Sequence, residues 1–296
     1  MVSESTPNSE IRTREVVMNG QSGFSTKATP EHVDELGRHL RRLVLKTIAG
    51  SSSGHPGGSL SATEILIALY FRVMSHDPAN PGWQDRDRFV LSKGHCTPIL
   101  YSVLSECGYF PTEELVTFRT INSRLQGHAH TMVPGVDAST GSLGQGLSIG
   151  LGMALAGRLG NKDYKTYVLI GDGECDEGQI WEAAMAAAHY KVGNLVAVID
   201  RNRIQNDRFT SEAMEIEPLE DKWRAFGWNV LQVDGHDVGD LCDALNSASL
   251  NQDTPLVVIA NTVKGKGVTF MENNPDFHGR APNEQELSDA LAELSG

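Results

Sequence analysis

Oxygen-bearing side chains follow two apolar runs of the sequence, at the point where each run ends. The run at 166–170 is followed by Asp172, which stands between two glycines. The run at 195–199 is followed by Asn202, and a helix-like stretch at 180–191 separates the two runs. This strand–helix–strand pattern predicts parallel strands whose carboxyl ends meet at one edge of a sheet, where open α/β folds bind their ligands.

The residue types at this edge favour a metal ion bound together with a diphosphate. Glycine lets the backbone approach phosphate closely, and the N-terminus of the following helix favours negative charge. The side chains of Asp172 and Asn202, with the main-chain carbonyl of Ile204, would complete the oxygen shell of Mg²⁺ around such a group. The pattern is not a P-loop, since no Gly-Lys-Ser/Thr follows, and its last glycine comes too late for a dinucleotide fingerprint. A plain βα turn with a capping aspartate is the simpler alternative.

Four further segments carry the resemblance to a known family. They are 53–58 (SGHPGG), 85–95 (DRDRFVLSKGH), 127–146 with its GH and TGSLGQG, and 278–282 (HGRAP). With the glycine-flanked Asp172 and, about thirty residues later, Asn202, their order and spacing resemble those of transketolases over about residues 30–285. The residues of these segments are most similar to those of chains that form the N-terminal subunit of a transketolase.

The resemblance implies a fold and a cofactor. The fold is α/β, a parallel central sheet with helices on both faces, which is the pyrophosphate-binding domain of thiamine diphosphate (ThDP) enzymes and would occupy residues 29–296. Mg²⁺ would be held by Asp172, Asn202 and the carbonyl of Ile204. Contacts to ThDP are implied for His95, Gly141, Ser142, Leu143, Gly173, Glu177, Asn202 and His278.

Three histidines match catalytic positions of the family. His55 and His278 match residues that polarise the C2 oxygen of the donor sugar and move protons around it, and His128 matches one that contacts the C1 hydroxyl. Imidazole is suited to proton transfer near neutral pH. Two departures stand close by, since Ser142 and Ala129 occupy positions where many members have proline.

One acidic residue of the fingerprint has two interpretations. Glu177 matches the carboxylate that links paired cofactor sites across a dimer. Alternatively, it is an acid at the start of a helix, where the helix dipole favours negative charge.

The implied activity is that of a transketolase, a transferase of carbohydrate metabolism. It would move a two-carbon glycolaldehyde unit from a ketose or ketose phosphate to an aldose, as in the pentose phosphate pathway. Family members bind the pyrimidine ring of ThDP with a second domain, and the sequence ends at Gly296, where that domain would begin. We therefore expect a separate C-terminal transketolase subunit to complete the site, in an α2β2 assembly in the cytoplasm.

Two other classes remain open. The chain would be half of a deoxyxylulose-phosphate-synthase-like or a decarboxylating 2-oxoacid dehydrogenase E1-like enzyme, or else a non-catalytic binding subunit. His55, His128 and His278 favour transketolase, because sugar hydroxyls need them and small keto acids mostly do not. The metal ligands Asp172 and Asn202 argue against a non-catalytic relic.

Composition excludes several classes of protein. The net charge of −13 argues against a nucleic-acid surface, which needs clustered Lys and Arg. No run of about eighteen apolar residues predicts a membrane span. The 4 cysteines are scattered without a C-x-x-C pair, which indicates reduced thiols rather than a disulfide framework. Residues 1–28 are polar and predict a disordered N-terminal extension.

Hydrophobic spacing predicts the elements that position these segments. Strands are expected at 88–91, 166–170, 195–199, 228–233 and 255–260, and helices at 31–51, 62–73, 98–107, 143–159, 180–191 and 238–249. The glycine- and serine-rich segment 50–59 is expected to be a break between the first two helices, and Thr29 is expected to cap the first of them.

Overall fold

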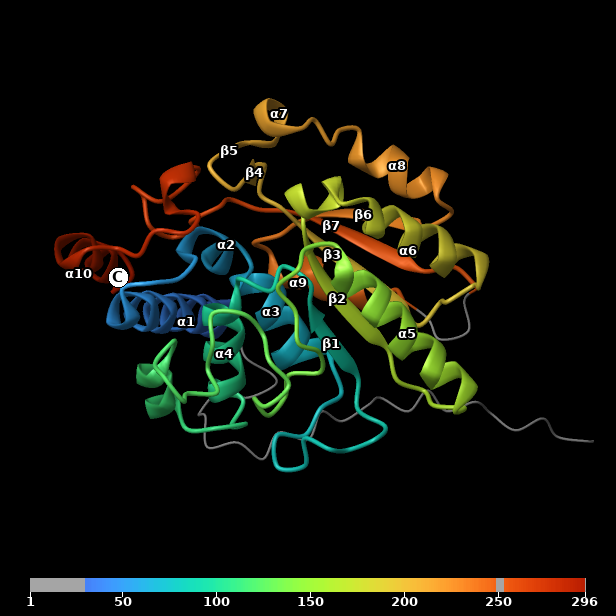
Figure 1. Cartoon of the computed structure of the whole chain (residues 1–296), viewed down its shortest axis with the longest axis horizontal. Coiled ribbons are helices and arrows are strands. Elements are labelled where there is room, and N and C mark those ends of the chain that lie inside the picture. The colour runs from blue at the N-terminus through green and yellow to red at the C-terminus, as the bar shows by residue number, and fades with distance from the viewer. Residues whose placement is uncertain (1–29, 249–252, 296) are drawn as a thin grey trace, which may run out of the picture.

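A parallel sheet forms the centre of the computed structural model, which describes residues 30–248 and 253–295. In this described part, five strands pair in the order β1-β2-β3-β7-β6, all of them parallel. They are β1 (Arg88–Leu91), β2 (Thr166–Gly171), β3 (Leu195–Arg201), β6 (Asn229–Asp234) and β7 (Leu256–Asn261). Figure 1 shows these strands at the centre of the molecule. The predicted fold class is confirmed.

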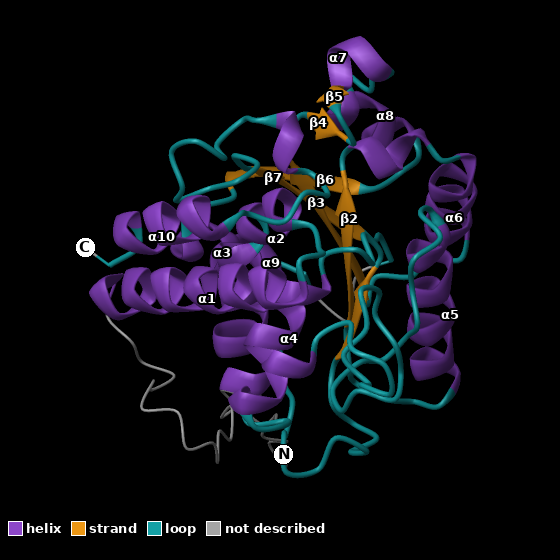
Figure 2. Cartoon of the chain, turned by 60° about the vertical axis from the view of Figure 1, so that its left-hand side comes forward, coloured by secondary structure: helices purple, strands orange, loops and turns teal. Residues whose placement is uncertain are grey.

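Helices cover both faces of this sheet (Figure 2). One face carries α1 (Pro30–Ser51), α2 (Pro56–Ser61), α3 (Thr63–Ala68), α4 (Thr97–Glu106), α9 (Val238–Asn246) and α10 (Glu284–Glu293), and the other carries α5 (Gln145–Leu159), α6 (Gly178–His189) and α8 (Leu219–Ala225). Successive side chains of a strand point to opposite faces. In β3, Val196 and Val198 therefore pack into the first core, whereas Ala197 and Ile199 pack into the second.

The inner strands are apolar because both of their faces are covered. All residues of β2, β3 and β7 except the last of each are buried, whereas most residues of the edge strand β6 are exposed. This burial explains why the strand–helix–strand unit was readable as continuous apolar runs.

The expected break at 50–59 is only partly correct. The first helix ends at Ser51, but α2 begins inside the segment, and a π-helical turn, η1 (Leu69–Val73), follows α3. Pro56 suits the first turn of a helix, where its missing N–H removes no hydrogen bond. A Cβ at Gly58 would lie 2.9 Å from Sγ of Cys96. This glycine therefore permits close packing and does not interrupt the chain.

The remaining predictions differ in detail. The helix expected to reach residue 249 ends at Asn246. The extension at 1–28 and the cap at Thr29 lie outside the described residues. Short elements that periodicity did not predict are α8 and η2 (Thr112–Thr117), η3 (Gly173–Asp176), β4 (Ile204–Gln205), β5 (Arg208–Phe209), α7 (Thr210–Ala213) and η4 (Pro275–Phe277). All 4 cysteines are free thiols. Among the described helices, none has the length and hydrophobicity needed to span a bilayer.

Candidate functional site

A cavity of about 320 Å³ lies at the carboxyl ends of β2 and β3. Asp172 follows β2 directly, and Asn202 follows β3, as the register between Gly171 and Asp200 places the two strand ends side by side. Of the residues assigned to the site from the sequence, all but Ser142 line this cavity: His55, His95, His128, Gly141, Leu143, Asp172, Gly173, Glu177, Asn202, Ile204 and His278. Folding thus brings together segments that lie more than 200 residues apart, from His55 to His278.

Three residues, Asp172, Asn202 and Ile204, bring oxygen atoms to the lining of the cavity. Asp172 is 2% exposed, and its carboxylate accepts hydrogen bonds from the N–H groups of Gly173 at 2.8 Å and Arg203 at 2.5 Å. Asn202 Oδ1 accepts from the N–H of Ile204 at 3.2 Å. Burial, and next the charge of Asp200, raises the pKa of Asp172 to about 6. A bound cation would relieve that cost.

The donor set fits Mg²⁺ held jointly with a diphosphate. One carboxylate, one amide oxygen and one carbonyl are hard oxygen ligands. Within 30–248 and 253–295, no three His, Cys, Asp or Glu side chains assemble as a metal site. With a single carboxylate among the three donors, a cation held here would take its remaining ligands and negative charge from phosphate oxygens.

Glu174 was not assigned a role from the sequence, yet it connects the loops that surround the cavity. Its buried carboxylate accepts hydrogen bonds from Ser92 Oγ and from the N–H groups of Gly144 at 2.9 Å and Gly171 at 3.0 Å. It therefore joins the end of β2 to the loop after β1 and to the loop before α5, which carries Gly141 and Leu143.

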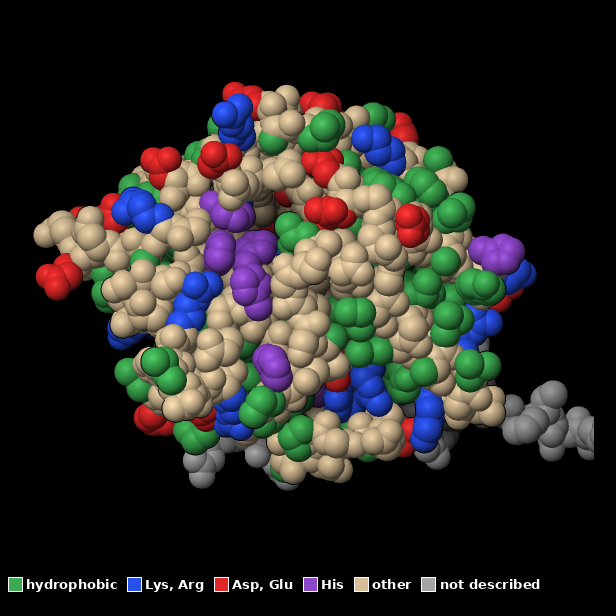
Figure 3. Space-filling view, viewed as in Figure 1, with side chains coloured by type: hydrophobic (Ala, Val, Ile, Leu, Met, Phe, Trp, Pro, Cys, Tyr) green, Lys and Arg blue, Asp and Glu red, His purple; other side chains and the backbone are tan. Residues whose placement is uncertain are grey.

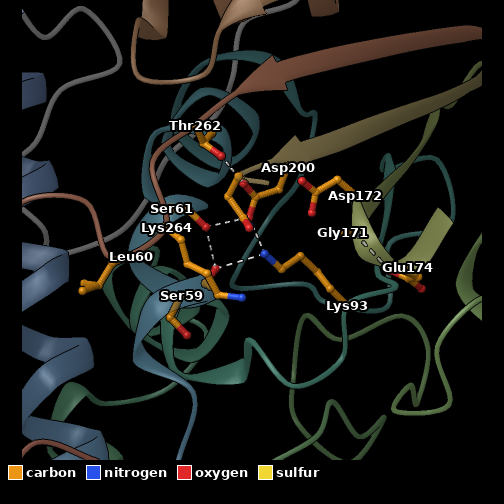
Figure 4. A network of polar contacts seen from close by, with 12 residues as sticks. Ser59, Leu60, Ser61, Lys93, Gly171, Asp172, Glu174, Asp200, Thr262 and Lys264 are labelled. Carbon is orange, nitrogen blue, oxygen red and sulfur yellow. Dashed lines mark hydrogen bonds and ion pairs between the residues drawn. The ribbon is translucent and has the colours of Figure 1, made fainter. Parts of the chain in front are cut away.

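The sequence analysis also missed a buried ion pair, one partner of which lines the cavity. Lys93 and Asp200 are 2% and 0% exposed and pair directly (Figure 4). Asp200 also accepts hydrogen bonds from the hydroxyls of Ser61 and Thr262, and Lys93 Nζ donates to the carbonyl of Gly58 at 3.1 Å. The pair therefore ties α2 and the loop after β1 to the ends of β3 and β7.

We expect Lys93→Met to lower the free energy of unfolding by about 3–5 kcal/mol, because it leaves the buried Asp200 charge uncompensated. Urea unfolding followed by circular dichroism measures this loss. Lys162→Met is the matched control, since Lys162 pairs with Asp85 in a half-exposed bridge and its loss should cost less than about 1 kcal/mol. Equal losses in the two variants would contradict the assignment.

Three histidine rings lie together in the lining of the cavity. The ring centroids of His55 and His95 are 4.9 Å apart, and each lies 5.3 Å from that of His278. Burial and nearby cations lower the pKa of His55 to about 4 and that of His278 to about 3, so both rings are neutral at pH 7. The pKa of His95 is lowered by the same causes. Figure 3 shows a group of purple histidine side chains beside a hollow of the surface.

The hydrogen-bond partners of these rings define what they offer to a ligand. Lys264 Nζ donates to His278 Nδ1 at 2.9 Å and to the carbonyl of Ile204 at 2.8 Å. An ammonium group only donates, so His278 Nδ1 accepts and its proton lies on Nε2. His55 Nδ1 is buried without a hydrogen-bond partner among the described residues. That unsatisfied nitrogen is available to form a hydrogen bond with a ligand.

His128 borders two cavities. Its exposed ring lines the cavity described above and a neighbouring, more open one of about 740 Å³, which Ser142 lines instead. Arg119, another residue that sequence reasoning missed, lines the second cavity and donates to Ser53 Oγ at 2.7 Å. Its charge contributes, after burial, to the lowered pKa of His128.

Glu177 occupies the cap position of α6, but its side chain makes no capping hydrogen bond. It is exposed and lines the cavity. No capping hydrogen bond holds the carboxylate, but its place at the start of α6 agrees with the helix-dipole interpretation, and the role across a dimer stays a prediction.

The chain is similar to proteins of one family along most of its length. The model of the family described as transketolase, thiamine diphosphate binding domain, matches residues 34–295. A 6-deoxy-6-sulfo-D-fructose transketolase subunit of Clostridium sp. (strain MSTE9) is 47% identical over 86% of this chain and 93% of its own length. An apulose-4-phosphate transketolase subunit of Phocaeicola vulgatus is 44% identical over 86% of this chain and 91% of its own.

Solved structures agree with these relatives. The transketolase of Campylobacter jejuni superposes with a TM-score of 0.85 at 32% identity, over 90% of this chain. The present chain spans 43% of that chain's length. The expected family and transketolase class of enzyme are confirmed, and with them the ThDP-binding nature of the domain. This chain belongs to the transketolase family and corresponds to the N-terminal, thiamine diphosphate-binding part of its longer members.

Proposed function

We propose that this chain binds ThDP with Mg²⁺ and works as the N-terminal subunit of a two-chain transketolase in the cytoplasm. The observation that carries the proposal is one cavity whose lining combines the oxygen donors of Asp172, Asn202 and Ile204 with the rings of His55 and His278. Asp172, Asn202 and the Ile204 carbonyl would hold the metal close to these rings, since Lys264 Nζ contacts both the Ile204 carbonyl and His278.

The residues of this chain would act around the reacting sugar. Bound ThDP would supply the electron sink that cleavage of a ketose carbon–carbon bond requires. The neutral rings of His55 and His278 are suited to hold and move a proton at the C2 oxygen of the donor. His128, at the open side of the cavity, would contact the C1 hydroxyl. Gly173 lets the loop after β2 pack against Gln205, since a Cβ there would lie 2.8 Å from that of Gln205, and its backbone would be open to the diphosphate.

The site has a surface that a second chain would cover. Leu143, which lines the cavity, is 38% exposed, and Met132, close in sequence to residues that line the second cavity, is 69% exposed. Two similar proteins carry the word subunit in their names. We infer a pyrimidine-binding partner chain that seats on this side.

A second face, which carries exposed hydrophobic side chains, would pair two such halves. Leu159 at the end of α5, and Met185 and Tyr190 on or just after α6, are 85%, 59% and 56% exposed. Figure 3 shows hydrophobic side chains over the side that α5 and α6 form. Contact between two copies over this side would give the paired halves of an α2β2 assembly.

The substrate class follows from the site and from the names of similar proteins. The histidine cluster favours a hydroxylated sugar over a small keto acid. The relatives act, by name, on a sulfonated fructose and on apulose 4-phosphate. We infer a ketose donor with an anionic terminal group and an aldose acceptor.

The split site predicts that the chain alone has no transketolase activity and that adding its partner restores it. The measurement is transfer of a two-carbon unit from a ketose phosphate to an aldose, with ThDP and Mg²⁺ present, for each chain alone and for the mixture. Calorimetry with ThDP and Mg²⁺, with and without the partner, shows whether the cofactor binds; binding without activity of the mixture would indicate a binding-only subunit. Normal turnover by this chain alone would refute the split site.

A further inference from the structure

His236 lies outside the cavity but reaches the segment that carries Lys264. The ring follows β6 in the loop before α9, and its Nε2 accepts a hydrogen bond from the N–H of Val263 at 2.8 Å. Gly235 permits this approach, because a Cβ there would lie 2.4 Å from Cγ2 of Thr262. The loop after β6 therefore packs tightly on the end of β7.

The ring is itself held in one tautomer. A backbone N–H is a donor, so Nε2 must accept, and the proton of neutral His236 lies on Nδ1. Nδ1 donates to Glu64 Oε2 at 2.8 Å. Glu64 is in turn fixed by two hydrogen bonds from the guanidinium of Arg41, at 2.7 and 2.8 Å. Burial opposes the charge of Glu64, but Arg41 and His236 hold the pKa of this carboxyl at about 2.

The segment next to Val263 places two groups in the site. Thr262 donates to Asp200, and Lys264 Nζ donates to the Ile204 carbonyl and to His278 Nδ1. Lys264 is 2% exposed and lines the cavity, so its ammonium has little freedom once the backbone is fixed. The direction of that side chain depends on the peptide planes on either side of Val263.

We propose that His236 is a positioning residue for Lys264. Held by Glu64, it fixes the Val263 amide and thereby aims the Lys264 ammonium between the Ile204 carbonyl and His278. This inference rests on the proposed function, because it assigns His236 an effect on the affinity of the same site for the metal and the diphosphate. Groups that orient residues in contact with a metal or its ligands change metal affinity by about 10–100-fold when they are removed.

Two variants at this position separate positioning from folding. His236→Leu removes the acceptor for the Val263 N–H, whereas His236→Gln offers an amide oxygen in its place. His76→Leu is the matched control, because His76 is a buried histidine that contacts Tyr70 and Tyr109 and does not line the cavity. The full-length chain, with its partner when affinity is measured, is used throughout.

The first measurement is affinity for ThDP in the presence of Mg²⁺, by calorimetry. His236→Leu should weaken binding about tenfold, and His236→Gln should restore most of the loss. In a Lys264→Met background, His236→Leu should have little further effect, because residues that act through one another are not additive. Unchanged affinity in His236→Leu, or independent losses in the double variant, would overturn the inference.

The second measurement does not depend on the cofactor. The rate of acetylation of the Lys264 amine, followed by mass spectrometry against the exposed Lys191, should rise in His236→Leu and stay at the wild-type value in His76→Leu. A wild-type chain that bound no ThDP would refute the proposed function, and the acetylation rates would still decide on His236. Equal rates in wild type and His236→Leu would reject it.

Discussion

Asp172→Asn is expected to weaken binding of ThDP with Mg²⁺ by about a hundredfold or more and to remove transketolase activity from the two-chain assembly. Asp172 is the one carboxylate among the three proposed ligands, so its loss removes the charge that holds the cation. The amide that replaces it has the same size but accepts at one atom only.

The same substitution should leave the metal-free chain folded. Asparagine loses the acceptor that one of two backbone N–H groups uses, at Gly173 or Arg203, which costs stability. It also removes a buried carboxylate whose pKa burial and Asp200 raise to about 6, which offsets that cost above this pH. The melting temperature without metal should therefore change little.

Calorimetry with ThDP and Mg²⁺ measures the loss of affinity, and differential scanning fluorimetry measures the melting temperature. Asp207→Asn is the control, because Asp207 is exposed in the turn between β4 and β5, close to the site but outside the cavity lining. Wild-type affinity in Asp172→Asn would rule out the proposed metal site.

His278→Asn is expected to lower kcat/KM for the ketose donor by about 10²–10⁴-fold, the range that removal of a positioned acid or base gives. The asparagine carbonyl can still accept from Lys264, which otherwise holds the His278 ring through Nδ1. The contact with Lys264 is thus kept, so the loss in kcat/KM should exceed any loss of ThDP affinity that follows from the implied contact of His278 with the cofactor.

Steady-state kinetics with the partner chain, over a series of donor concentrations, test this expectation. His189→Asn serves as the control, since His189 is exposed at the end of α6, away from the cavity lining. An unchanged rate in His278→Asn would favour the alternative of a keto-acid decarboxylating enzyme, for which this histidine has no sugar oxygen to serve.

Local sequence determined the frame of the site. The apolar runs of β2 and β3 and the helix between them are continuous in the chain, so their residue types alone predict a parallel unit with Asp172 and Asn202 at its ends. A buried strand must be apolar on both faces, and this requirement is visible without any knowledge of its neighbours. The histidines were found differently, through motifs that resemble those of a family.

Tertiary structure decided which side chains support that frame. Lys93 meets Asp200 across 107 residues, and Glu174 meets Gly144 across 30. Neither residue type nor hydrophobic spacing indicates such a partner. A charged residue in a loop or at a strand end has the same local pattern whether its side chain reaches solvent or a buried ion pair. The prediction of a break at 50–59 was partly wrong for a related reason, since α2 begins at Pro56.

Gly58 resembles a flexible link in the sequence, yet in the structure it marks a helix packed against Cys96. Local interactions act between neighbours in the chain, and their signature can therefore be read from spacing. Contacts between distant segments arise only when the sheet brings them together. The ion pair, the loop anchors and the position of Lys264 are of this second kind.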